Sequence, residues 1–340
     1  MKTFMINRWL LAAGLVVLVG LPVGCGREEA EDRPTVAVTI HPLASIVREL
    51  VGEELAVVTL LPPEASPHNY ELNPRQMQAV ADARAVIRVG LGVDDWAVRA
   101  AGATGREDLP VLAISDYLEL GERGDPHGDH AGEHDHAHHE HADHDHAHHE
   151  HADHDHDGQA HDGHAHHGHA HGAIDPHVWL DPVLMRRATA ELAEHLTELL
   201  PGQGEAIAAR ARQLDGQLAE LDTAYREQLA PFQGATITTY HGAYDRLADR
   251  YGLRTRPLMA SGAVGSVTAD AIARVMAEGG VVFIEPQAGH EVAQALRERA
   301  GVSVHVLDPL GSPRLDDRDT YLALMRYNLR TLVEGLKQMP

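Results

Sequence analysis

Histidine and carboxylate side chains stand just past the ends of several strand-like segments of this chain. The residues in such positions are His68, His241, Glu285 and Asp308, after the predicted strands 55–61, 235–239, 281–284 and 302–307. A further histidine, His177, occupies a loop that Pro176 and Pro182 stiffen. Ligands of open α/β sheets bind at the carboxyl ends of the strands. Two such edges that face each other would therefore gather these groups in one cleft.

Three neutral imidazoles and one carboxylate suit a tetrahedral Zn²⁺ ion, at about 2.0–2.2 Å per bond. Hard ions such as Mn²⁺ prefer more oxygen ligands, whereas Cu²⁺ would bind these groups at least as tightly, so the prediction of zinc also rests on metal availability. The chain thus contains a candidate zinc site formed by His68, His177, His241 and Asp308. The alternative is that these side chains only cap turns or satisfy local hydrogen bonds.

Two further residues, Glu285 and His41, border the same predicted cleft. Glu285 is expected to orient a ligand rather than to bind the metal itself; the alternatives are a fifth ligand and a helix cap. His41 follows the first predicted strand, 35–40, and is a weaker candidate for supporting the site. His195, within a predicted helix, and His305, within a predicted strand, are not expected to bind the ion.

The elements that must position these residues alternate between strands and helices, which is typical of an α/β fold with mostly parallel sheets. The remaining strands are predicted at 35–40, 85–89 and 111–114. A helix at 203–230, about 40 Å long at 1.5 Å per residue, is predicted to join a lobe at 35–202 to a lobe at 234–340. We therefore predict two α/β lobes, each a small mostly parallel sheet with flanking helices, joined by one long rigid helix.

Residues 125–173 interrupt the first lobe with a segment that holds 20 of the 27 histidines and no lysine or arginine. The ten-residue repeat HDHAHHEHAD occupies 134–143 and again 144–153. A segment with so few apolar residues is predicted to be disordered without metal. The repeat histidines that we expect to act as accessory metal ligands are His134, His136, His138, His139, His141, His144, His146, His148, His149 and His151.

This insertion is predicted to gather zinc and to raise its local concentration near the core site, as tethered ligands do. Neutral imidazole is the form that binds metal, so binding by the insertion should fade below about pH 6. One alternative is a solvated charged loop without a role in binding. Another is a histidine-rich metal buffer, in which the insertion itself is the main metal binder.

The N-terminal residues 1–24 have the features of a secretion signal, namely a basic start and an apolar core too short to span a membrane. The only cysteine, Cys25, ends the run LPVGC, which is similar to a bacterial lipobox except that Pro22 stands where leucine is usual. We predict that Cys25 carries a lipid and that residues 25–34 form a tether, so that the protein is an extracytoplasmic, membrane-anchored lipoprotein. The alternative is an ordinary signal peptide and a free thiol in a periplasmic protein.

The overall charge restricts the classes of partner. The formal net charge is −23, which argues against nucleic acid because its phosphates require basic contacts. An acidic chain suits a cation as its ligand. A zinc enzyme is not expected, because the chain lacks an HExxH motif or a similar catalytic signature.

Motifs spread over residues 35–338 resemble, in the same order, those of the zinc-binding receptors of ABC importers, members of the cluster A metal-receptor family. The matching stretches are PHNYELNPRQ (67–76), DPHVWLDP (175–182), YHGAYDRLADRYGL (240–253), FIEPQAGHEVAQAL (283–296) and VLDPLG (306–311). The resemblance implies two four-stranded lobes bridged by a rigid helix, with a metal ion held between them. It also implies a receptor, here expected to be monomeric, that delivers Zn(II) to a cognate ABC permease.

By position, the resemblance makes His68, His177 and His241 the imidazole ligands and Asp308 the carboxylate ligand. Manganese and iron members of the family usually carry glutamate in place of His241, so the histidine favours zinc over the alternative of a manganese or nickel receptor. Some zinc members have a glutamate ligand where this chain has Pro67. Either Asp308 or water is therefore expected to fill the fourth position.

Overall fold

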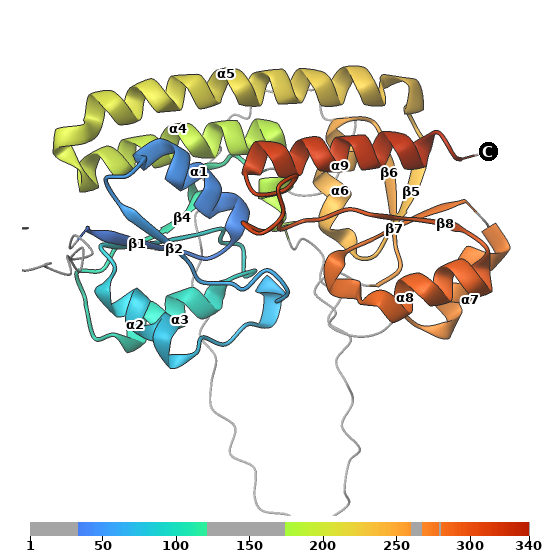
Figure 1. The fold of residues 1–340 in the computed structure, drawn as a ribbon, viewed down its shortest axis with the longest axis horizontal. Helices are drawn as coiled ribbons and strands as arrows, with labels where there is room; N and C mark the ends of the chain where they lie inside the picture. The colour runs from blue at the N-terminus through green and yellow to red at the C-terminus, as the bar shows by residue number, and fades with distance from the viewer. Residues whose placement is uncertain (1–32, 121–173, 260–266, 279, 340) are drawn as a thin grey trace, which may run out of the picture. The chain divides into compact units, whose positions relative to one another are not determined.

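The computed structural model describes residues 33–120, 174–259, 267–278 and 280–339, and Pro34–Pro340 make one compact unit. The predicted signal segment, Cys25, most of the tether and the whole histidine-rich insertion with its repeat histidines lie outside the described residues. Among the described residues, none of the helices combines the length and the apolar character that a membrane span requires. The predicted α/β class is confirmed by two separate four-stranded sheets, both fully parallel (Figure 1).

The first sheet has the strand order β2-β1-β3-β4. Its strands are β1 (Thr35–Val38), β2 (Ala56–Thr59), β3 (Ala85–Arg88) and β4 (Val111–Ala113). The central strand β1 is apolar and almost wholly buried, and it pairs Val36 with Val57 on one side and with Ala85 on the other. One face of the sheet carries α1 (His41–Val51), and the opposite face carries α2 (Pro74–Asp82) and α3 (Asp95–Ala103).

The second sheet repeats the same arrangement, with the order β6-β5-β7-β8. Its strands are β5 (Thr236–Thr239), β6 (Arg254–Pro257), β7 (Val281–Ile284) and β8 (Ser303–Val306). Its helices are α6 (Asp245–Arg250), α7 (Ala269–Glu278), α8 (His290–Ala295), which continues into a π turn at Leu296–Ala300, and α9 (Tyr321–Leu336). Helix α9 covers one face, and α7 and α8 cover the other (Figure 1).

Two long helices connect the sheets. Helix α4 (Pro182–Leu199) packs along α5 (Gly204–Leu229), and α5 also contacts α1 beside the first sheet and α9 beside the second. Near its start, Arg210 donates to the carbonyl of Leu50 in α1, and near its end the hydroxyl of Tyr225 donates to the carbonyl of Met325 in α9. One continuous apolar core therefore runs from the first sheet, under α4 and α5, to α9 and the second sheet.

Two elements were not predicted from the sequence. Strand β6 reads RTRP and is mostly exposed at the sheet edge, where polar residues and a proline are tolerated and the apolar strand signal is absent. Helix α3 is short and rich in alanine, so it lacks a strong apolar stripe. A 3₁₀ turn, η6 (Gly242–Tyr244), directly precedes α6. The lobe boundaries at 35–202, 203–230 and 234–340 stay predictions.

Candidate metal centre

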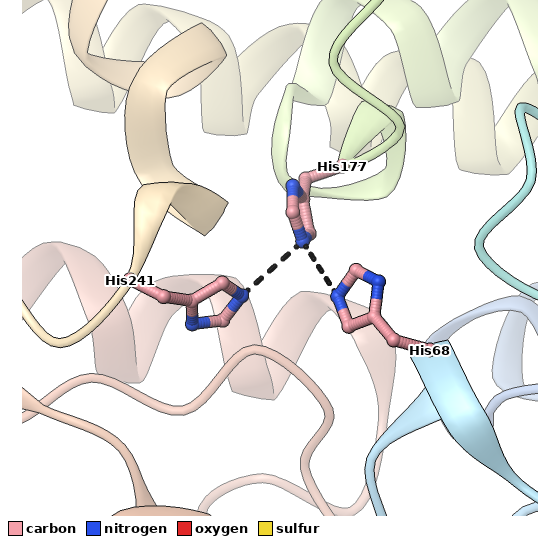
Figure 2. A group of neighbouring side chains, drawn as sticks. All are labelled: His68, His177 and His241. Atoms are coloured by element: carbon pink, nitrogen blue, oxygen red, sulfur yellow. Dashed lines mark hydrogen bonds between the residues drawn. The ribbon is translucent and has the colours of Figure 1, made fainter. Parts of the chain in front are cut away.

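Three imidazoles, from His68, His177 and His241, converge on one point between the two sheets (Figure 2). Their nearest nitrogens all lie within 4.8 Å of one another. The Nε2 atom of His177 is 3.3 Å from Nε2 of His68 and 3.3 Å from Nε2 of His241. Ligands of a tetrahedral ion with bonds of about 2.0–2.1 Å lie roughly 3.3 Å apart. The two spacings at His177 therefore fit a zinc-sized ion.

A short 3₁₀ turn after β2 positions His68. The turn η1 (Pro67–Asn69) is capped by the hydroxyl of Ser66, which accepts from the His68 amide at 3.4 Å. The indole of Trp96 donates to the carbonyl of Pro67 at 2.7 Å and fixes the turn to α3. Burial, followed by the neighbouring His177 and His241, lowers the pKa of His68 to about 4. This imidazole is thus neutral and ready to bind a cation at physiological pH.

The loop that precedes α4 positions His177, which is 2% exposed. The Asp175 carboxylate accepts from the His177 amide at 3.1 Å and from its ring Nδ1 at 2.7 Å. Burial disfavours the Asp175 carboxylate, but the hydrogen bonds from His177 and the charge of Arg246 hold the pKa of Asp175 below its ordinary value. With the proton on Nδ1, the Nε2 lone pair of His177 points toward the other two rings.

The end of β5 positions His241, in extended backbone just before η6. Its Nδ1 lies 2.5 Å from Oε1 of Glu285, which directly follows β7. Strands β5 and β7 are neighbours in the sheet, so residues just past their ends come together. Glu285 is 4% exposed, and its Oε1 lies beside His241 Nδ1 without a hydrogen bond of good alignment to any described residue.

Asp308 is not part of this group of nitrogens. Its Oδ1 accepts from the amides of Leu310 and Gly311 at 3.0 and 2.8 Å, and its Oδ2 pairs with Arg318 at 3.2 Å. The side chain is buried and closes the turn after β8. Both oxygens are therefore engaged, and the assignment of Asp308 as the fourth ligand stays a prediction.

His41, the weaker candidate, is also outside the group. It is buried at the start of α1, and its Nε2 lies 3.0 Å from the carbonyl of Asp319, while its Nδ1 has no hydrogen-bond partner within the described ranges. Burial and then the nearby Arg48 lower the pKa of His41. Its contact joins α1 to the segment before α9.

Sequence reasoning missed Asp175, although it stands two residues before His177. The available signal was the D-P-H order, because an aspartate commonly accepts from the backbone amide two residues on. It also missed Trp96, whose contact with Pro67 joins residues far apart in the chain. Trp179 lies against the His177 ring, with ring centroids 5.2 Å apart, and its indole donates to the carbonyl of Pro309.

Curated relatives extend over most of the chain. The high-affinity zinc uptake system protein ZnuA of Paracoccus denitrificans is 36% identical over 302 residues, covering 86% of this chain and 89% of the relative. The zinc-binding lipoprotein AdcA of Streptococcus pneumoniae is 24% identical over 340 residues, covering 97% of this chain. The match spans only 61% of the length of AdcA.

Solved structures have the same fold. A crystal structure of ZnuA superposes with a TM-score of 0.67 at 19% identity, covering 89% of this chain and 99% of the other. The periplasmic zinc-binding protein TroA from Treponema pallidum superposes with a TM-score of 0.67 at 20% identity, with the same coverage. The family model of the zinc-uptake complex component A, periplasmic, matches residues 36–335. The chain therefore belongs to the ZnuA family of periplasmic zinc-uptake components.

Proposed function

We propose that this protein is an extracytoplasmic, high-affinity zinc receptor that delivers Zn(II) to the permease of an ABC importer. The observation that carries the proposal is the convergence of three imidazole nitrogens, two pairs of which lie 3.3 Å apart, close to the edge length of a zinc-centred tetrahedron. The names of the relatives support it, since the Paracoccus denitrificans and Yersinia pestis proteins are high-affinity zinc uptake proteins. In this proposal zinc is the cargo of the protein and not a resident cofactor.

In the proposed site, His68, His177 and His241 bind the ion through Nε2. The fourth position belongs to solvent as long as Asp308 keeps Arg318 and the two backbone amides. Asp308 joins the ion only if it gives up part of these contacts. Asp308→Asn distinguishes the two cases, because an amide preserves most of the turn but is a poor zinc ligand.

The choice of zinc rests on the donor set. Three imidazoles suit Zn²⁺, whereas Mn²⁺ prefers sites with more oxygen ligands. Nickel also accepts imidazole, so competition between Zn²⁺, Ni²⁺ and Mn²⁺ for the metal-free protein tests the assignment. Displacement of zinc by equimolar Mn²⁺ would contradict it.

The two segments outside the described residues have proposed accessory roles. The insertion 125–173 gathers zinc for the core site, and a lipid on Cys25 holds the otherwise monomeric receptor at the membrane surface. Deletion of 125–173 should slow zinc loading more than it weakens the core site. Intact-mass measurement of the membrane fraction, compared with Cys25→Ser, tests for the lipid.

The deciding experiment is a zinc titration of the metal-free protein against a chelator of known affinity. We expect one tight site in the full chain and in the variant that lacks 125–173, with a weaker site in His68→Ala and loss of the site in His241→Ala. If deletion of the insertion alone removes tight binding, the insertion is the main binder and the protein is a metal buffer. A screen for hydrolytic turnover by the zinc-loaded protein tests the alternative of a zinc enzyme.

A further inference from the structure

The three imidazoles of the centre differ in how they are supported. His177 Nδ1 is hydrogen-bonded to Asp175 at 2.7 Å, and His241 Nδ1 is 2.5 Å from Glu285. Both carboxylates are almost fully buried. No comparable carboxylate contact to His68 occurs within the described part of the chain, where its supports are the cap from Ser66 and the Trp96 bond to Pro67.

A carboxylate beside Nδ1 has two effects on a histidine ligand. It favours the tautomer with the proton on Nδ1, which leaves the Nε2 lone pair free for the metal. It also fixes the ring orientation and raises the basicity of the ligand, and loss of such a partner typically weakens metal binding about 10–100-fold. His177 has this hydrogen bond in the structure, and the Glu285 carboxylate lies beside Nδ1 of His241, close enough to form one.

The loop that carries His177 is also joined to the second sheet. Arg246 of α6, the helix that follows His241, donates from Nε to the carbonyl of Asp175 at 2.8 Å. One turn later, Arg250 forms an ion pair with Asp181 at 2.5 Å, at the start of α4. These contacts hold His177 and His241 together through one short helix.

Contacts on the other side of the same loop strengthen this connection. The indole of Trp179 donates to the carbonyl of Pro309 at 2.7 Å, beyond β8 of the second sheet. The hydroxyl of Tyr321, the first residue of α9, donates to the carbonyl of Trp179 at 2.9 Å. The His177 loop is therefore fixed to elements of the second sheet on both sides, although it precedes that sheet in the chain.

The His68 loop belongs instead to the first sheet. It follows β2, and Trp96 of α3 holds it. Across the centre, the side chain of Gln287 donates to the carbonyl of Pro63 at 3.3 Å. Only this long hydrogen bond, among those between described residues, joins the 60–68 loop to the second sheet.

We infer that Asp175 and Glu285 are positioning residues that make His177 and His241 a preformed two-imidazole half-site on the second sheet, which His68 completes from the first sheet. This inference rests on the proposed function, because it assumes that these imidazoles bind zinc. In this inference the three ligands contribute unequally to affinity, because His177 and His241 bind the ion first and His68 adds the third bond.

The first test compares histidine variants of the full chain, titrated with Zn²⁺ against an excess of chelator that outcompetes weak sites. His68→Ala should keep one measurable core site of reduced affinity, whereas His177→Ala and His241→Ala should each weaken binding at least tenfold further. Equal losses in all three variants would overturn the half-site. If the unaltered protein has no tight zinc site, the proposed function fails instead, and the two failures are thereby distinguished.

The second test addresses the carboxylates. Asp175→Ala and Glu285→Ala should weaken zinc binding about 10–100-fold, and Asp175→Asn and Glu285→Gln, which keep an acceptor oxygen, should recover part of the loss. Glu198→Gln is the matched control, because Glu198 lies 3.7 Å from Nδ1 of His195 outside the centre; its zinc affinity should equal that of the unaltered protein. Affinity at the unaltered level in both alanine variants would overturn the positioning role.

The third test measures the tautomers of His177 and His241, which would not change if the two carboxylates only stabilised the fold. In ¹⁵N-labelled metal-free protein, ring-nitrogen NMR should assign the proton to Nδ1 in the signals that disappear in His177→Ala and His241→Ala. Asp175→Ala should change the tautomer of His177 but not of His241, and Glu285→Ala the reverse. Unchanged tautomers in correctly folded variants, as judged by circular dichroism, would overturn the inference even if zinc affinity fell.

Discussion

The two sheets have the same strand order, but different groups occupy the carboxyl ends of their central strands. In each, the first and third strands lie side by side at the centre, where open α/β sheets commonly bind ligands. Beyond β5 and β7 of the second sheet, that position holds His241 and Glu285. Beyond β1 and β3 of the first sheet, it holds Asp94, which is fully buried.

Asp94 uses both of its carboxylate oxygens in hydrogen bonds at the ends of β1 and β3. Its carboxylate accepts from the hydroxyl of Thr39 at 2.7 Å and from the amides of Val89 and Gly90 at 2.7 and 3.0 Å. Gly90 has a φ of +98°, a conformation that other residues rarely adopt, which allows the chain to turn around the carboxylate. The first sheet supplies its candidate ligand, His68, from the loop after the outer strand β2. One strand arrangement thus supports a structural carboxylate in one place and a candidate ligand in the other.

The largest effect on zinc affinity should come from a substitution of His241, at the carboxyl end of β5 in the second sheet. His241→Ala removes a proposed ligand, so zinc affinity should fall by more than the roughly 100-fold that follows loss of a carboxylate that supports a ligand. The stability of the metal-free protein should change little, because His241 is partly exposed. Chelator competition gives the affinity and urea unfolding the stability; a variant that retains full affinity would remove His241 from the site.

A substitution of Asp94 in the first sheet should lower the stability of the protein and leave its zinc affinity unchanged. Asp94→Ala leaves the Thr39 hydroxyl and two backbone amides buried without their acceptor, so the free energy of unfolding should fall by about 3 kcal/mol. The zinc affinity of the folded protein should stay unchanged, since none of these groups contacts the three imidazoles. Urea unfolding and a zinc titration on the same sample check this prediction. A large loss of zinc affinity with unchanged stability would contradict the structural role of Asp94.

Zinc should stabilise the protein through the proposed site, to which the second sheet contributes His241. At a free zinc concentration of 100 times Kd, binding to the native state adds about 2.7 kcal/mol to the free energy of unfolding. Asp94→Asn should keep this increment, whereas His241→Ala should lose it at the same zinc concentration. Thermal unfolding with and without zinc measures the difference, and an increment that survives His241→Ala would assign the stabilising site elsewhere in the chain.

The smallest effect concerns His68 in the metal-free protein. Its folded pKa is about 4, below the ordinary value of 6.5. As pH falls through this window, the unfolded chain binds a proton on this imidazole before the folded chain does, so the contribution of His68 to stability is lost between about pH 6.5 and 4. Urea unfolding at several pH values should give a shallower decline for His68→Ala than for the unaltered chain, with His195→Ala as the control. Parallel curves would contradict the shift.

Much of the architecture was predictable because its determinants are local. Apolar β-branched runs predicted seven of the strands, and the confirmed α/β class followed from their alternation with helices. The exception, β6, has no apolar pattern because its edge position buries little of it. The three histidines could be selected for a similar reason, because each lies in a loop that follows a strand or is stiffened by prolines, and both kinds of loop were predicted to border one site.

The sequence by itself thus determined the fold class and the three imidazoles of the candidate centre. Only the tertiary structure decided which partner each of the carboxylates Glu285 and Asp308 contacts. Glu285 reaches His241 because β5 and β7 are neighbours, although 44 positions separate the two residues in the chain. Asp308, equally well placed by its strand, instead holds its own turn and Arg318. A carboxylate binds whichever partners the folded backbone brings within hydrogen-bonding distance, and strand order and loop closure, not spacing along the chain, determine those partners.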